Sequence, residues 1–169
     1  MALTIFPKST TVYFDLDRKL CDEYVSDLDE PDLIINQALN NDELIEASLD
    51  VIESGANVVI DSLPNQGNHL RDDRERFQWL TRAFNRIQRA LLGTDCVVTV
   101  LNQIRQVPST GSVYNPHEGC LDASVKIKLT TAEKRGRDRL IYVEIEKSFW
   151  GLEGERCTLL VSKVNVTER

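Results

Sequence analysis

Several features are missing from this sequence, and each absence excludes a class of protein. No apolar run approaches the roughly 20 residues that a membrane-spanning helix needs, so we expect no membrane segment. Met1 to Lys8 has no basic stretch followed by a long apolar run, which argues against a secretory signal and predicts a cytoplasmic protein. Acidic residues outnumber basic ones, 27 to 20. The formal net charge of −7 argues against nonspecific nucleic-acid binding by the whole surface, although a local basic groove is compatible with it.

Cysteine pairs of the CxxC kind are absent too. The four cysteines are scattered, which favours free thiols in a reducing compartment: Cys21, Cys96, Cys120 and Cys157. His117 and Cys120 have a spacing that suits metal ligation, but two ligands do not make a zinc site, and we interpret them as loop residues. The length of 169 residues predicts one domain, spanning residues 1–169.

The first half of the chain alternates short β-rich runs with helical stretches, which predicts an α/β fold. Two helices are expected, and Gly55 and Gly93 are placed to end them. In the second helix the apolar residues form one stripe, and three arginines share another face: Arg82, Arg86 and Arg89. The expected elements are strands at 11–14, 33–35, 57–61 and 95–101, and helices over 40–54 and 71–92.

The second half follows a different pattern. Residues 107–119 contain two prolines and two glycines, which predicts a long loop. Alternating polar and apolar residues then predict strands at 124–129 and 139–147, with a charged hairpin tip at 131–138, and a further strand is expected at 156–164. We expect these strands to extend the parallel sheet as antiparallel neighbours with one solvated face.

Polar side chains follow three of the expected strands. Asp15 and Asp17 follow the first, Asp61 and Ser62 follow the third, and an Asn-Gln pair at 102–103 follows the fourth. Ligands bind α/β sheets at the carboxyl ends of parallel strands, so we expect a site there. A carboxylate after a buried strand is the Walker B arrangement that holds Mg²⁺. A strand that simply ends in a solvated aspartate is the alternative.

The order of these motifs resembles the RecA family of recombinase ATPases. The matching segments are residues 13–17, Val58-Val59-Ile60-Asp61-Ser62, Val100-Leu101-Asn102-Gln103-Ile104-Arg105 and the late strand at 143–147. The likeness extends over Thr11 to Val166, and Asn-Gln-Ile-Arg is its most specific part. It implies a RecA-like, mostly parallel central sheet flanked by helices, with antiparallel strands toward the C-terminus.

The resemblance also implies roles for individual residues. Asp17 would orient the attacking water, Asp61 with Ser62 would lie beside Mg²⁺, and Gln103 would sense the γ-phosphate. Lys147 would reach the nucleotide of a neighbouring subunit. The chain departs from the family in two places, because Asp17 replaces a longer glutamate and Phe149 replaces a second lysine.

The same resemblance implies two DNA-binding loops, a long one at 107–119 and a short one at 62–70. The residues placed to contact DNA are Arg71, Arg74, Arg105 and Tyr114. For the helix arginines the alternative is a solvated face paired with neighbouring acids. Trp79 and Trp150 are expected to pack rather than to recognise a ligand.

A phosphate-binding loop is absent from the given sequence. Such a loop needs glycines and a Lys-Ser/Thr pair that opens a helix, and the family has it before the first of these strands. Met1 to Thr10 contains no glycine, and the first glycine of the chain is Gly55. The P-loop strand and helix are therefore missing, and the domain is read as a truncated RecA-like core. ATP and Mg²⁺ would bind only if another chain completed the site.

These observations predict a non-hydrolysing regulatory or structural paralogue in DNA recombination or repair. It would act by self-assembly as a homo-oligomer, through an active RecA-type recombinase, or on single-stranded DNA. The alternative is a fragment or split part of an ATP-dependent recombinase whose phosphate-binding loop lies elsewhere. A diverged RecA-fold scaffold with no link to DNA is the third interpretation.

Overall fold

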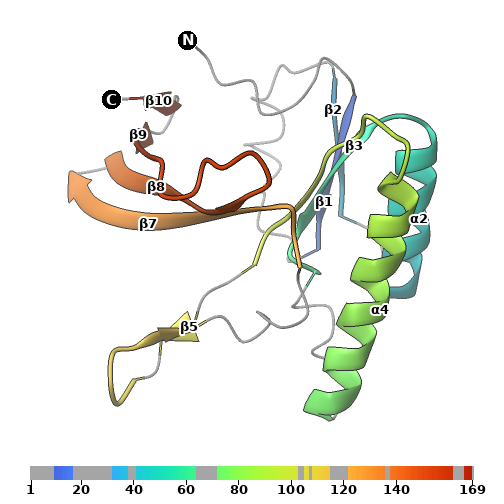
Figure 1. Ribbon diagram of the computed structural model, residues 1–169, viewed down its shortest axis with the longest axis horizontal. Helices are drawn as coiled ribbons and strands as arrows, with labels where there is room; N and C mark the ends of the chain where they lie inside the picture. Colours follow the sequence, from blue (N-terminus) through green and yellow to red (C-terminus); the bar gives the residue numbers. More distant parts are fainter. Residues whose placement is uncertain are drawn as a thin grey trace. The chain divides into compact units, whose positions relative to one another are not determined.

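The chain divides into two compact units, residues 1–121 and 122–169, which are described separately (Figure 1). The computed structural model describes residues 10–16, 32–37, 41–63, 72–102, 105–106, 108–114, 122–135, 138–161 and 166–168. The prediction of a single domain is not tested by this division.

The first unit is built on a four-stranded parallel sheet in the order β2-β1-β3-β4. Its strands are β1 (Thr11–Asp15), β2 (Leu33–Asn36), β3 (Asn57–Asp61) and β4 (Val98–Val100). β1 pairs with β2 on one side and with β3 on the other, and β3 pairs with β4. The sequence prediction of a parallel α/β sheet is confirmed for this unit.

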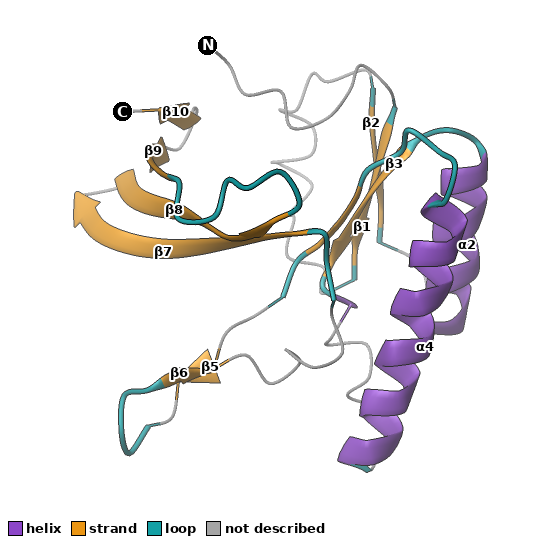
Figure 2. Cartoon of the chain, in the orientation of Figure 1, coloured by secondary structure: helices purple, strands orange, loops and turns teal. Residues whose placement is uncertain are grey.

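Two helices pack on one face of this sheet (Figure 2). They are α2 (Asn41–Glu53) and α4 (Asp73–Leu91). Asp72 caps α4, because its side chain accepts a hydrogen bond from the backbone N–H of Arg74 at 2.8 Å. After α2 the chain turns at Gly55, whose φ of 83° is a conformation that side chains with a Cβ rarely adopt. Both predicted helices are confirmed to within two residues at each end.

The buried core of the first unit lies between the sheet and the two helices. Phe14, Val58 and Ile60 contribute from the strands, and Leu44 and Leu80 contribute from the helices. All five side chains are almost completely covered. The continuous apolar run of β3 therefore reflects a strand that is buried on both of its faces.

The predicted long loop at 107–119 is wrong in part, because its beginning forms a small hairpin. β5 (Arg105–Gln106) pairs antiparallel with β6 (Val113–Tyr114). Arg105 is the register partner of Tyr114. The prolines and glycines that suggested a loop are also typical of the turn between two short strands, so composition alone did not separate the two.

The second unit is a four-stranded antiparallel sheet in the order β10-β9-β8-β7. Its strands are β7 (Val125–Arg135), β8 (Asp138–Ser148), β9 (Arg156–Val161) and β10 (Val166–Glu168). They form a sheet of their own, so the expected extension of the parallel sheet is wrong. The expected tip at 131–138 is wrong as well, because β7 and β8 remain paired as far as Arg135 and Asp138.

The charged residues before position 136 suggested a turn. They belong to the strand instead, because charged side chains can lie on a solvated strand face. The pairing of β7 with β8 shifts register at Lys126/Ile127 and at Thr131/Glu133.

None of the helices that the structure describes is long and apolar enough to cross a membrane.

Candidate functional site at the carboxyl end of the parallel sheet

Two carboxylates lie side by side where the central strands of the parallel sheet end. Asp15 is the last residue of β1 and the register partner of Asp61, the last residue of β3. Asp15 is completely buried, whereas Asp61 is partly exposed. The backbone N–H of Leu16 donates to the carbonyl of Asp61 at 2.9 Å, which holds the two strand ends together.

Each carboxylate accepts a hydrogen bond from a neighbouring strand or its end. Gln37, just after β2, donates from Nε2 to Oδ2 of Asp15 at 2.7 Å. The hydroxyl of Tyr13 donates to Oδ2 of Asp61 at 2.8 Å. These bonds fix the orientation of both carboxylates. Sequence reasoning named Asp61 but not Gln37 or Tyr13 as site residues. Each is far in sequence from the carboxylate it contacts, and the contact depends on which strands pair in the sheet.

Ser62 and Asn102 belong to the same edge. Ser62 follows Asp61 through a cis peptide bond and is almost completely buried. Asn102 follows β4, and the neighbouring Leu101 N–H donates to the carbonyl of Ile60 at 2.9 Å, so β4 ends beside β3. The structure thus places Asp61, Ser62 and Asn102 at one edge of the parallel sheet.

This edge could hold a divalent cation through carboxylate oxygens, since Mg²⁺ prefers oxygen ligands. Asp61 is the more accessible of the two carboxylates, and its Oδ2 accepts the hydrogen bond from Tyr13. Within the described parts of the chain no group of three or more His, Cys, Asp or Glu residues is arranged to hold a metal. Asp17 and Gln103, the predicted water-orienting and γ-phosphate-sensing residues, lie outside the described residues. The described residues by themselves therefore do not make a cation site.

Lys147 lies in the second unit and is paired within it. Its Nζ contacts Oδ1 of Asp122 at 2.7 Å, and its side chain is 45% exposed. The hydrogen bond from Lys147 lowers the pKa of Asp122. A lysine in this pair can reach a nucleotide phosphate only by leaving Asp122, so its predicted role needs an exchange of partners.

The DNA-contact candidates are dispersed over the first unit. Arg105 and Tyr114 are brought opposite each other by the β5–β6 hairpin, which the sequence did not reveal. Arg74 is exposed in the first turn of α4. Arg71 lies outside the described residues. Of these candidates, the structure places the backbones of Arg105 and Tyr114 next to each other.

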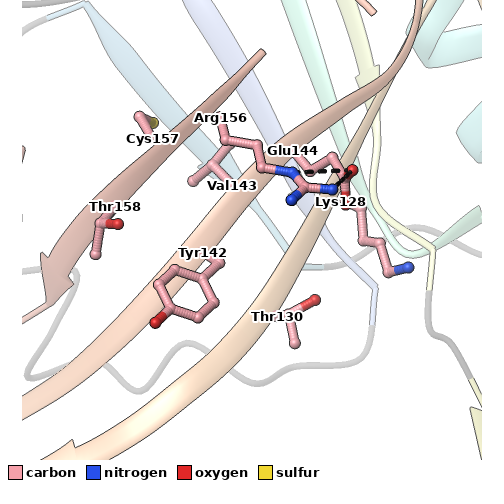
Figure 3. A pocket seen from close by; sticks show the side chains of 8 residues that line it. All are labelled: Lys128, Thr130, Tyr142, Val143, Glu144, Arg156, Cys157 and Thr158. Atoms are coloured by element: carbon pink, nitrogen blue, oxygen red, sulfur yellow. Dashed lines mark hydrogen bonds and ion pairs between the residues drawn. The ribbon is translucent and has the colours of Figure 1, made fainter. Parts of the chain in front are cut away.

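The antiparallel sheet carries a second polar surface that the sequence did not indicate. Figure 3 shows a hollow of about 410 Å³ on β7, β8 and β9, in which the side chains of neighbouring strands form cross-strand rows. Tyr142 lies between Thr130 and Thr158, and Glu144 lies between Lys128 and Arg156. Arg156 donates from Nε to Oε1 of Glu144 at 3.1 Å, and Lys128 pairs with Glu146 at 3.4 Å. The charged side chains that line this hollow are thus paired with opposite charges.

The expectation that Trp150 packs in the interior is wrong. Phe149 and Trp150 are 85% and 71% exposed in the turn between β8 and β9, with their rings edge to face at 6.4 Å. The turn is ordered by hydrogen bonds from the N–H of Ser148 to Glu153 and from the N–H of Trp150 to Ser148 Oγ. Trp79, on α4, is partly buried, as expected.

Comparisons with known proteins leave the family as a prediction. No protein-family model matches the chain, and no curated protein matches it. The RecA likeness therefore rests on the sequence motifs alone.

Proposed function

We propose that this chain is a RecA-like module without a phosphate-binding loop that acts in DNA recombination or repair without hydrolysing ATP on its own. It would act by self-assembly, with an active RecA-type recombinase, or on single-stranded DNA. The observation that carries the proposal is the polar edge of the parallel sheet, where Asp61 and Ser62 end β3 beside Asp15 and Asn102. This is the place and the residue chemistry that a Walker B strand requires.

The absence of a phosphate cradle supports the non-hydrolysing part of the proposal. Backbone N–H groups and a lysine must surround the triphosphate before an acid such as Asp61 can work on Mg²⁺. The given sequence has no glycine before Gly55, so it supplies no such loop before β1. The carboxylates instead bind the donors of Gln37 and Tyr13.

Nucleotide binding tests this part directly. We expect isothermal calorimetry of the chain with ATP and Mg²⁺ to show no binding at sub-millimolar concentrations, because the phosphates have no cradle. The Asp61→Asn variant should behave identically in the same titration. Tight binding by the wild type that Asp61→Asn abolishes would contradict the proposal.

DNA binding tests the other part. Titration of a fluorescent oligodeoxythymidine at low salt should show binding that needs no ATP and weakens with added salt. Arg105→Ala should reduce the dependence of log K on log salt by about 0.7 per lost phosphate contact. Arg139→Ala, which removes an exposed arginine of β8, is the matched control and should leave the slope unchanged. No binding at low salt would remove DNA from the proposal.

The second candidate is a split recombinase whose loop is supplied by another polypeptide. The partial exposure of Asp61 at the sheet edge favours it, because that carboxylate is still accessible to a cation from outside. An upstream reading frame that encodes a Gly-rich Lys-Ser/Thr loop would support it. Magnesium-dependent ATP binding that appears only when that polypeptide is added would decide in its favour.

A further inference from the structure

The outer faces of the two helices carry opposite charges. Among the α2 positions whose burial is described, the exposed ones are all acidic and recur at helical spacing: Glu43, Glu46, Asp50 and Glu53. On α4 the exposed face opposite Leu80 and Ile87 carries arginines and amides: Arg74, Gln78, Arg82, Asn85 and Arg89. Acids on α4 are confined to its first turn. The helix layer therefore has an acidic stripe and an arginine stripe, each on one helix.

The two helices run side by side in the same direction. Each connects two parallel strands of one sheet, and both lie on the same face (Figures 1 and 2). Arg86, on the flank of α4, joins them by an ion pair to Glu46 at 2.8 Å. This contact shows which residues of the two helices lie at the same height.

Counting from that pair aligns the rest of the two stripes. Three or four residues further along, Arg89 lies at the height of Asp50, and three or four residues back, Arg82 lies at the height of Glu43. The rise of ~1.5 Å per residue makes each step about 5 Å. Arg82 and Arg89 form no ion pair within the described part of the chain, so their charges face outward unmatched.

We infer that this two-helix face is a self-complementary interface that binds a second copy of the chain. A two-fold axis parallel to the helices and between them would place α4 of one copy over α2 of the other. Such a rotation keeps the height of every residue, so Arg89 would face the partner's Asp50 and Arg82 would face the partner's Glu43. The arrangement forms twice in the dimer, because the contact is isologous.

A second copy fits this face better than a polyanion does. The acidic stripe lies within roughly one interhelical distance, 8–10 Å, of the arginine stripe, which is also about the Debye length at 0.1 M salt. A nucleic-acid strand along α4 would therefore be repelled by α2. A second copy presents the same two stripes in reversed order, so each stripe faces a stripe of opposite charge.

A charge exchange between two variants tests the interface. Sedimentation of the wild type at low salt should show a monomer–dimer equilibrium. The variant Arg82→Glu with Arg89→Glu should be monomeric at the same concentration, and so should Glu43→Arg with Asp50→Arg. Mixing the two variants should restore a dimer, because each then offers two stripes of the sign that the other lacks.

Controls separate this result from general charge effects. Arg89→Glu should weaken the dimer at least tenfold, whereas Arg139→Glu, which changes the net charge equally on β8, should leave it unchanged. Circular dichroism of each variant checks that it is folded. A monomeric wild type, variants that dimerise like the wild type, or a mixture that stays monomeric would each overturn the inference.

The inference rests on the self-assembly named in the proposed function, and the two fail differently. If the wild type is monomeric but binds single-stranded DNA, and the Arg82→Glu, Arg89→Glu variant loses that binding, the arginine stripe is a nucleic-acid surface. That outcome overturns the interface and retains the proposed function. A dimer that binds neither DNA nor an active recombinase retains the interface and overturns the proposed role in DNA recombination or repair.

Discussion

The two sheets of this protein differ in how much of their apolar surface is buried. Every hydrophobic side chain in the buried core lies between Val12 and Ile87, in the parallel unit. Among the residues of the antiparallel unit whose burial is described, only Ser148 is buried. Ile127 and Leu129 on β7 are 50% and 57% exposed. The parallel sheet is thus stabilised by a core, whereas the antiparallel sheet depends more on its strand pairing.

The difference follows from the sequence pattern of the strands. β3 is apolar at consecutive positions, and α2 and α4 belong to the same unit, so the strand can be buried. β8 alternates, and its polar residues meet partners on neighbouring strands, as Glu144 does with Arg156. Exposed ion pairs contribute little to stability, typically about 0–1 kcal/mol each. The polar edge with Asp15 and Asp61 therefore belongs to the better buried of the two sheets.

Equal truncations in the two sheets should give very different losses of stability. Ile60→Ala, at a completely buried position of β3, should lower the free energy of unfolding by about 2–5 kcal/mol. Leu129→Ala, at a position 57% exposed on β7, should lower it by about 1 kcal/mol or less. Urea unfolding followed by circular dichroism measures both. Similar losses at the two sites would show that the antiparallel sheet is covered as well as the parallel one.

The comparison extends to the polar contacts of the parallel sheet. Gln37→Leu removes a donor from the buried carboxylate of Asp15, and we expect a loss of about 1.5–3 kcal/mol in the free energy of unfolding. Tyr13→Phe removes the donor to the more accessible Asp61 and should cost about 1 kcal/mol. The same urea experiment checks both. If Tyr13→Phe proved the costlier change, Asp61 would be the structural carboxylate and Asp15 the better candidate for function.

The sequence was a good guide where its periodicity was uniform. The apolar stripe of α4 and the continuous apolar run of β3 each have one structural solution, so both elements were predicted within two residues. The alternation in residues 124–147 predicted strands correctly. It did not reveal to which sheet they belong, because pairing between distant strands has no local signal.

The candidate site was predictable in part for the same reason. Asp61 and Ser62 follow directly from a strand that ends in polar residues, so the sequence located them. The burial of Asp15 and its bond from Gln37 depend on the order β2-β1-β3, which is a property of the whole sheet. The exposure of Trp150 also escaped prediction, because a tryptophan in a hairpin turn can be ordered by backbone bonds without being buried.

The smallest expected effect concerns the charged rows of the antiparallel sheet. The hydrogen bond from Arg156 lowers the pKa of Glu144, with further help from the charges of Arg156 and Lys128 against the opposing effect of desolvation. A depressed carboxyl pKa means that this contact stabilises the fold above the ordinary pKa and is lost as the pH falls through the lowered value. Arg156→Ala should therefore raise the pKa of Glu144 toward that of an ordinary glutamate, which carbon-detected NMR titration can measure. The midpoint of urea unfolding at neutral pH should hardly change, because the pair is exposed. An unchanged pKa would show that Glu144 is held by other charges, and a large loss of stability would mean that the strands depend on this pair far more than on their backbone bonds.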